Sequence, residues 1–278
     1  MEHGRLTEMK RLGKEARIRA LEVIHEANSG HVGGSFSAIE ILIALYFCVL
    51  NIDASNPTWS KRDRVVISKG HCSPAVYSIL SLKGYFSKEQ LMREYRKTDG
   101  HFSGHVEMHV PGVDMSTGSL GQGISIAAGM ALSAAIRKES WRTFVLTGDG
   151  ELQEGQNWEA FMAAGKLRLD NLTAIIDYNG VQLDGRVEDI CSLEPLDEKI
   201  RCFGWNVVWA DGHDIAEMVR AFESAAQCKG RPTAIIAKTV KGKGVSFMEG
   251  RHEWHGTPPD EIQYRMGMEE LYNTVEEV

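Results

Sequence analysis

Apolar residues recur with helical spacing in some parts of the chain and form short continuous runs in others. From residue 6 to residue 27 they recur every three or four positions, which predicts an amphipathic helix. A second predicted helix, residues 36–50, is apolar almost all round. Such a helix must be covered on every side, either by the rest of the chain or by another subunit. The pattern leaves both kinds of cover open.

Short apolar runs rich in β-branched residues separate the other predicted helices. The runs predict strands over residues 64–68, 143–147, 173–177, 207–210 and 233–237. Helical patterns lie between them over residues 121–138, 158–167 and 215–226. Strands buried on both faces that alternate with helices indicate a parallel sheet. The predicted fold class is therefore α/β, a doubly wound, mostly parallel sheet with helices on both faces, in a single domain over residues 1–278.

Composition and charge exclude several classes of partner. The chain has 278 residues, 43% hydrophobic and 25% charged, with a net charge of −7 and no basic cluster, so neither nucleic acid nor a membrane is expected as a partner. The longest apolar run, residues 41–50, is about half the ~20 residues that span a bilayer, and the first residues lack a signal sequence. Five widely spaced cysteines without a CxxC pair indicate reduced thiols and a cytoplasmic location.

Oxygen-bearing side chains follow two consecutive predicted strands. Asp149 lies between Gly148 and Gly150 after one strand, and Asn179 follows the next. One strand-helix-strand unit joins the two strands, so their carboxyl ends are expected to be neighbours. Ligands of parallel sheets bind at these carboxyl ends. Two such side chains and a backbone carbonyl make half of an octahedral Mg²⁺ shell and leave positions for phosphate oxygens. An ordinary turn at each position is the alternative, but it does not explain the matched pair.

A Gly-Asp-Gly triplet followed about thirty residues later by Asn resembles the signature of thiamine diphosphate enzymes. Five ordered blocks resemble the amino-terminal third of transketolases: Ser29-Gly30-His31, Ser68-Lys69-Gly70-His71, Gly104-His105-Val106-Glu107, residues 117–123 and residues 148–155. The resemblance covers nearly the whole chain. Complete transketolases also contain a pyrimidine-binding domain and a carboxy-terminal domain, which have no counterpart here. The chain thus resembles the N-terminal subunit of a split transketolase.

The resemblance implies a set of site residues. It assigns Asp149, Asn179 and the carbonyl of Val181 to Mg²⁺, with Ca²⁺ or Mn²⁺ able to take its place. It places around thiamine diphosphate His71, Gly118, Ser119, Leu120, Gly150, Glu154, Asn179 and His255. It also implies that His31, His105 and His255 line the sugar channel, bind sugar oxygens and carry protons near neutral pH.

The resemblance also implies an activity that needs a second chain. Transketolases transfer a two-carbon ketol unit from a ketose or ketose phosphate to an aldose. The glutamate that activates the cofactor belongs to the pyrimidine-binding domain, so this chain alone is expected to be nearly inactive. A separate C-terminal subunit is the expected partner, in a heterotetramer with two copies of each chain. The alternatives are a split 2-oxo acid decarboxylase, dehydrogenase or related synthase, and a non-catalytic relic of the fold.

Several polar residues keep two interpretations. In transketolases the glutamates that match Glu154 and Glu159 link paired cofactor sites, whereas acids at a helix start are usually dipole partners. Lys241 and Lys243 either meet the diphosphate or stay solvated. His213 and His252 receive no role.

The histidine-rich loop over residues 95–116 has a zinc interpretation of its own. His101, His105 and His109 are spaced four apart, as zinc ligands on a helix would be, but the glycines and Pro111 in this loop oppose a helix. The chain also departs from the transketolase pattern, because Val32 and Val106 stand where the family usually has proline. Tyr178 stands where the family often has a small or acidic residue, and Cys72 stands where glycine or alanine is common.

Overall fold

A computed structural model, which describes residues 2–273, contains one parallel sheet. Its strands are β1 (Arg64–Ile67), β2 (Thr143–Gly148), β3 (Leu172–Tyr178), β4 (Asn206–Asp211) and β5 (Thr233–Lys238). All neighbours are parallel, in the order β1-β2-β3-β5-β4. The predicted fold class is confirmed, and each predicted strand boundary lies within one residue of the observed one.

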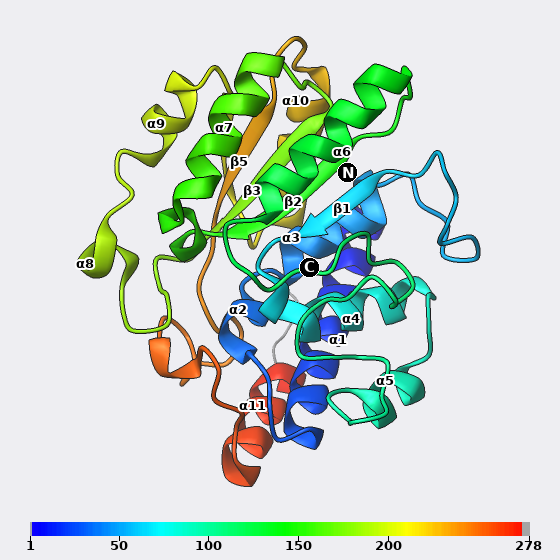
Figure 1. Cartoon of the computed structure of the whole chain (residues 1–278). Coiled ribbons are helices and arrows are strands. Elements are labelled where there is room, and N and C mark those ends of the chain that lie inside the picture. The colour runs from blue at the N-terminus through cyan, green and yellow to red at the C-terminus, as the bar shows by residue number, and fades with distance from the viewer. Residues whose placement is uncertain (1, 274–278) are drawn as a thin grey trace.

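Helices cover both faces of the sheet, as Figure 1 shows. One face packs against α1 (His3–Glu26), α3 (Ile39–Ala44), α4 (Ser73–Lys83) and α10 (Ile215–Gln227). The other packs against α6 (Gly123–Arg137), α7 (Gly155–Leu167) and α9 (Leu196–Cys202). Successive residues of β3 divide between the two cores, because side chains alternate along a strand: Ile175 belongs to the first core and Ile176 to the second. The continuous apolar runs of the sequence are explained by this double burial.

The remaining short helices lie around the carboxyl end of the sheet and beside α1. They are α2 (Val32–Phe36), α5 (Lys88–Glu94), α8 (Val187–Cys191), α11 (Glu261–Asn273) and the 3-10 turns Gly70–Cys72, Gly150–Gln153 and His252–Trp254. A third apolar cluster joins α1, α2, α11 and the segment 245–254. This cluster anchors the segment that carries His255 to the rest of the chain.

The predicted helix over residues 36–50 is wrong as a single element. The chain forms α2, then α3, then a π-helical turn at Leu45–Val49. The break falls at Ser37, whose hydroxyl donates a 2.6 Å hydrogen bond to the carboxylate of Asp177 in β3. The apolar side chains of α3 are fully buried against α1, α4 and α10, so the cover comes from this chain itself.

The long loop, the cysteines and the lengths of the apolar helices were also predicted from the sequence. Residues 95–116 form a long loop without a helix, as predicted. All five cysteines are free thiols, also as predicted. Among residues 2–273, no helix has the length and apolar character needed to cross a bilayer.

Candidate active site

The sheet register brings the two predicted oxygen ligands to one edge. Gly148 at the end of β2 pairs with Asp177 in β3, so Asp149 and Asn179 leave adjacent strands side by side. Asp149 is 2% exposed, and its carboxylate accepts hydrogen bonds from the backbone N–H of Gly150 at 2.8 Å and of Gly180 at 2.5 Å. The neighbourhood predicted from the sequence is therefore present.

Asn179 forms the Asx turn that was the simpler interpretation of its position. Its Oδ1 accepts a 3.1 Å hydrogen bond from the N–H of Val181. Asn179 and Val181 nevertheless line the same cavity as Asp149. The turn therefore fixes the amide at the cavity wall instead of removing it from the site.

This cavity, which we call the edge cavity, has a volume of about 280 Å³. It is bounded by sequence-predicted residues from several elements: His71, Leu120, Asp149, Gly150, Glu154, Asn179, Val181 and His255. Ser119 and Leu120 are exposed next to it, and Gly118 packs so closely on the His105 ring that a Cβ there would lie 2.8 Å from Cδ2. Gly118 also has a φ of 145°, which an L-residue rarely adopts.

A buried ion pair that we did not predict supports the floor of the edge cavity. The Lys69 ammonium donates to Asp177 and to the carbonyl of Gly34, the latter at 2.8 Å. Asp177 also accepts hydrogen bonds from Ser37 and Thr239. Burial alone would raise the pKa of Asp177, but Lys69 and the hydroxyl donors hold it below its ordinary value. The only sequence signal was that Lys69 belongs to a recognised block.

Glu151 is a second buried carboxylate that sequence reasoning missed. Its oxygens accept hydrogen bonds from the Ser68 hydroxyl and from the N–H groups of Gly121, at 2.9 Å, and Gly148, at 3.2 Å. Burial raises the pKa of Glu151 above its ordinary value. The Glu151 side chain thus links three of the sequence blocks by hydrogen bonds: the block that begins at Ser68, residues 117–123 and residues 148–155.

Four histidines gather above the edge cavity from distant parts of the chain. The His31 ring centroid lies 5.1 Å from that of His71, 5.5 Å from His255 and 6.1 Å from His105. His71 and His255 are 5.2 Å apart. The structure therefore brings together all four histidines that the resemblance singled out.

Burial lowers the pKa of all four histidines. Burial, followed by the charge of Arg96, lowers the pKa of His31 to about 4, and burial, followed by Lys241, lowers that of His255 to about 3. Burial also lowers the pKa of His71 and of His105. A lowered pKa favours the neutral imidazole, which donates one hydrogen bond and accepts another. The proton-carrying role of His31, His105 and His255 stays a prediction.

The two interpretations of the lysine pair separate in the structure. Lys241 is 2% exposed and lines the edge cavity, where its ammonium donates to the carbonyl of Val181 at 3.1 Å and lies 2.9 Å from Nδ1 of His255. Burial, followed by repulsion from Lys69, lowers the pKa of Lys241 to about 8. Lys243 instead lies partly exposed, 3.5 Å from Glu249.

The remaining candidates lie farther from the cavity floor. Glu154 is exposed at the cavity rim, just before α7, and Glu159 is exposed on α7 itself. The helix that the zinc interpretation requires is absent: Nε2 of His109 lies 2.7 Å from the carbonyl of His101, whereas His105 faces His31. His252 is exposed beside Glu253, and His213 lies elsewhere, against Glu40.

The residues of the edge cavity fit an anionic cofactor with a divalent cation. Asp149 and Asn179 supply oxygen donors beside the carbonyl of Val181, and the Lys241 ammonium adds a positive charge. Burial, followed by the charge of Asp177, raises the pKa of Asp149 to about 6. Among the described residues, Nδ1 of His31 and Oε1 of Gln182 are buried without hydrogen-bond partners.

Comparisons with known proteins point to one family. The family model "Transketolase, thiamine diphosphate binding domain" matches residues 9–271. The 6-deoxy-6-sulfo-D-fructose transketolase subunit SqwG of Clostridium sp. (strain MSTE9) is 46% identical over 256 residues, 92% of this chain and 93% of the relative. An apulose-4-phosphate transketolase subunit of Phocaeicola vulgatus is 41% identical over 266 residues, 94% of this chain and 93% of the relative.

Solved structures agree in fold. The transketolase of Campylobacter jejuni superposes with a TM-score of 0.90 at 34% identity, over 95% of this chain but only 42% of the longer chain. The match to separate subunits is thus nearly end to end, whereas the match to that solved transketolase is to its thiamine diphosphate-binding part. The chain belongs to the transketolase family, as a subunit of the N-terminal, thiamine diphosphate-binding type.

Proposed function

We propose that this chain binds the diphosphate end of thiamine diphosphate through Mg²⁺ and, with a separate C-terminal subunit, transfers two-carbon ketol units between sugars. The observation that carries the proposal is the edge cavity, where Asp149 and Asn179 meet beneath a cluster of four histidines. Nucleophilic carbon chemistry on a ketose is what the cofactor supplies when bound.

The metal-binding role falls to residues at the ends of β2 and β3. Asp149, Asn179 and the carbonyl of Val181 would hold Mg²⁺, and Gly150 gives the backbone close access to the diphosphate. The Asp149 carboxylate already has backbone donors, so its orientation is set before the cation arrives. Lys241, whose ammonium lies 3.1 Å from the carbonyl of Val181, would neutralise part of the diphosphate charge.

The histidines would bind and orient the substrate and the cofactor. Burial favours the neutral form of His31, His105 and His255, in which each imidazole would offer one donor and one acceptor to sugar oxygens. His71, together with Gly118, Ser119 and Leu120, would contact the cofactor. His71 and His255 line the edge cavity, so negative charge held there would raise their pKa.

A separate partner chain completes the site in this proposal. The edge cavity of about 280 Å³ lies at the lower limit of the roughly 300–1,000 Å³ typical of small-molecule pockets, so it encloses only part of the cofactor. The two relatives that match end to end are named as subunits. We therefore place the pyrimidine-binding domain on a second chain, in a cytoplasmic heterotetramer with two copies of each, and place Glu154 near their contact.

The substrates proposed are a ketose donor and an aldose acceptor, as sugars or sugar phosphates. The relatives are named for 6-deoxy-6-sulfo-D-fructose and for apulose-4-phosphate, and both names describe anionic sugars. Arg96, hydrogen-bonded to Ser29 at 2.9 Å beside the histidine cluster, gives this part of the site positive charge.

Reconstitution tests the function. The chain is mixed with its candidate partner chain, thiamine diphosphate and Mg²⁺, and transfer of a ketol unit from ketose to aldose is measured beside each chain alone. Transfer only in the mixture is expected. Transfer by this chain alone would contradict the need for a partner, and release of CO₂ from a 2-oxo acid without ketol transfer would favour the decarboxylase alternative.

A further inference from the structure

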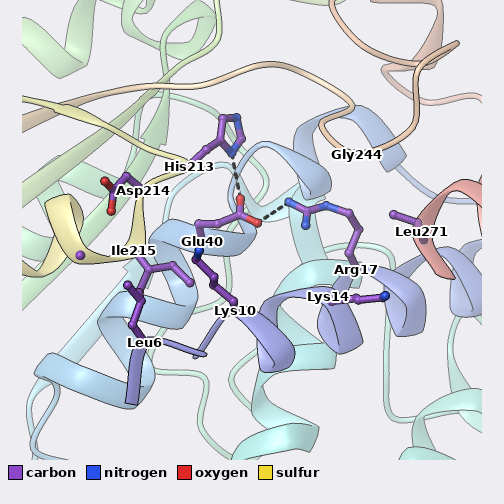
Figure 2. Close-up of a pocket in the computed structure, with 11 residues that line it drawn as sticks. Leu6, Lys10, Lys14, Arg17, Glu40, His213, Asp214, Ile215, Gly244 and Leu271 are labelled. Atoms are coloured by element: carbon purple, nitrogen blue, oxygen red, sulfur yellow. Dashed lines mark hydrogen bonds and ion pairs between the residues drawn. The ribbon is translucent and has the colours of Figure 1, made fainter. Parts of the chain in front are cut away.

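We propose that Arg17, Glu40 and His213 form a positioning relay that holds the segment after β5 and thereby places the Lys241 ammonium against the cofactor diphosphate. The inference rests on the proposed function only for the identity of that ligand. The three residues come from α1, α3 and the connection between β4 and α10, outside the edge cavity, and line a second cavity of about 440 Å³ (Figure 2). Nothing in the transketolase resemblance assigned them a role.

The relay is a continuous chain of short hydrogen bonds. Arg17 Nη2 donates to Glu40 Oε1 at 2.6 Å, and His213 Nδ1 donates to Glu40 Oε2 at 2.8 Å, as the dashed lines of Figure 2 show. The Val240 N–H then donates to His213 Nε2 at 2.8 Å. Because Nε2 accepts this bond it carries no proton, so the proton of the neutral ring lies on Nδ1, facing Glu40.

The charges of the relay are balanced inside the protein. The Glu40 side chain is 13% exposed, and its partial burial alone would raise its pKa, but Arg17 and His213 hold that pKa below the ordinary value. The ionised carboxylate fixes the histidine tautomer that can accept from Val240, in the way that a carboxylate orients a histidine bound to a metal. A purely apolar contact at this place could not select the tautomer.

Val240 precedes the lysine that lines the edge cavity. The neighbouring residues are also tied: Thr239 bonds to Asp177 and to the carbonyl of Tyr178, and the Gly242 N–H donates to Gly33 at 3.0 Å. Between these ties, the backbone N–H of Val240 is held by His213. Arg17 also packs on the far end of the segment, where a Cβ at Gly244 would lie 2.9 Å from its Cδ. The relay therefore contacts the segment on both sides of Lys241.

Two substitutions separate positioning from simple packing. His213→Gln places an acceptor oxygen near the position of Nε2 and keeps the bond from Val240. His213→Asn keeps a donor near the position of Nδ1 toward Glu40 but leaves Val240 without its acceptor. His3→Asn, at an exposed histidine, is the matched control. If His213→Asn does not fold, Glu40→Gln serves in its place, because it removes the charge that fixes the tautomer.

The first measurement is amide hydrogen exchange of the full chain without cofactor. Peptides over residues 239–244 are expected to exchange faster in His213→Asn, while His213→Gln and His3→Asn stay close to the unsubstituted chain and peptides of β2 and β3 are unchanged in all of them. Faster exchange throughout the sheet in both His213 variants would reduce the residue to a packing role and overturn the proposal. This measurement does not depend on the cofactor.

The second measurement is the dissociation constant of thiamine diphosphate, with Mg²⁺, for the complex of chain and partner, followed by tryptophan fluorescence. His213→Asn is expected to weaken binding about tenfold, as loss of a charge-assisted contact does, and His213→Gln by much less. In a Lys241→Met background, His213→Asn should have no further effect, because its route to the ligand is gone. Additive losses would contradict the relay; absence of binding in the unsubstituted complex would contradict the proposed function instead.

Discussion

Two aspartates on neighbouring strands, Asp149 after β2 and Asp177 in β3, are both buried yet lie in opposite electrostatic environments. Asp177 has the Lys69 ammonium and two hydroxyl donors, and its pKa is held below the ordinary value. Asp149 has only backbone N–H donors, and burial raises its pKa to about 6. A carboxylate paired within the fold serves stability, whereas a buried carboxylate with a raised pKa at a cavity wall is a candidate for ligand binding.

The largest effect should follow from unpairing Asp177. Lys69→Met leaves a buried carboxylate without its cation, so we expect the free energy of unfolding to fall by about 3–5 kcal/mol, measured by urea denaturation of the chain. Adding Asp177→Asn should recover part of this loss, because the uncompensated charge is removed. A loss below about 1 kcal/mol in Lys69→Met would show that the pair is not a structural support.

Asp149→Asn should behave in the opposite way. The folded-state pKa is raised from 3.8 to about 6, so ionised Asp149 lowers stability above about pH 6, and this cost disappears as the pH falls toward 4. The variant should therefore unfold no more easily than the unsubstituted chain at pH 7. In the complex with the partner, Mg²⁺-dependent binding of thiamine diphosphate should weaken at least about a hundredfold. If Asp149→Asn lost stability but still bound the cofactor, Asp149 would be a structural residue and not a ligand-binding one.

The pH dependence of metal binding gives a sharper comparison. Below about pH 6 a proton occupies Asp149, and Mg²⁺ must displace it, so the apparent affinity should fall about tenfold per pH unit. The measurement is an Mg²⁺ titration of cofactor binding by the complex between pH 5 and pH 7.5. Asp149→Asn, with no proton to lose, should show the same weak affinity across this range; a parallel slope in the variant would assign the titration to another group.

The smallest effect is expected one residue after Asp177. The Tyr178 hydroxyl donates a 2.5 Å hydrogen bond to Glu194 in a solvent-exposed position. Tyr178→Phe should lower the free energy of unfolding by only about 0.5 kcal/mol, because water replaces the lost partner. Thermal unfolding of the variant checks this, and a change as large as that of Lys69→Met would show that exposure does not explain the difference between the two bonds.

The strands and the positions of Asp149 and Asn179 were predictable from the sequence alone. Strands buried on both faces leave a continuous apolar run, and the residue types that follow such runs are read without knowledge of packing. Asp149 and Asn179 each follow such a run. Because β2 and β3 are parallel neighbours, the two residues come together at one edge of the sheet. The histidine cluster came only from the resemblance, because its members approach from distant loops.

The polar pairs inside the fold were not predictable. Lys69 and Asp177 are separated by 108 residues, and Glu40 and His213 by 173, so no local sequence pattern predicts either contact. The same limit explains the wrong single helix over residues 36–50: apolar spacing favoured continuity, but the hydroxyl of Ser37 bonds to Asp177 and the helix breaks there. His213, which received no role from the sequence, acquires one only through partners that the fold supplies.

The apolar side chains of α3 are fully covered by other helices of the same chain. If a neighbouring domain or subunit covered an all-apolar helix, separation of the two would expose the apolar side chains of that helix to water. Here α1, α4 and α10 supply the cover instead. The core around α3 therefore needs no second chain, in agreement with the match of this chain to 93% of two relatives named as subunits and to 42% of a solved transketolase chain.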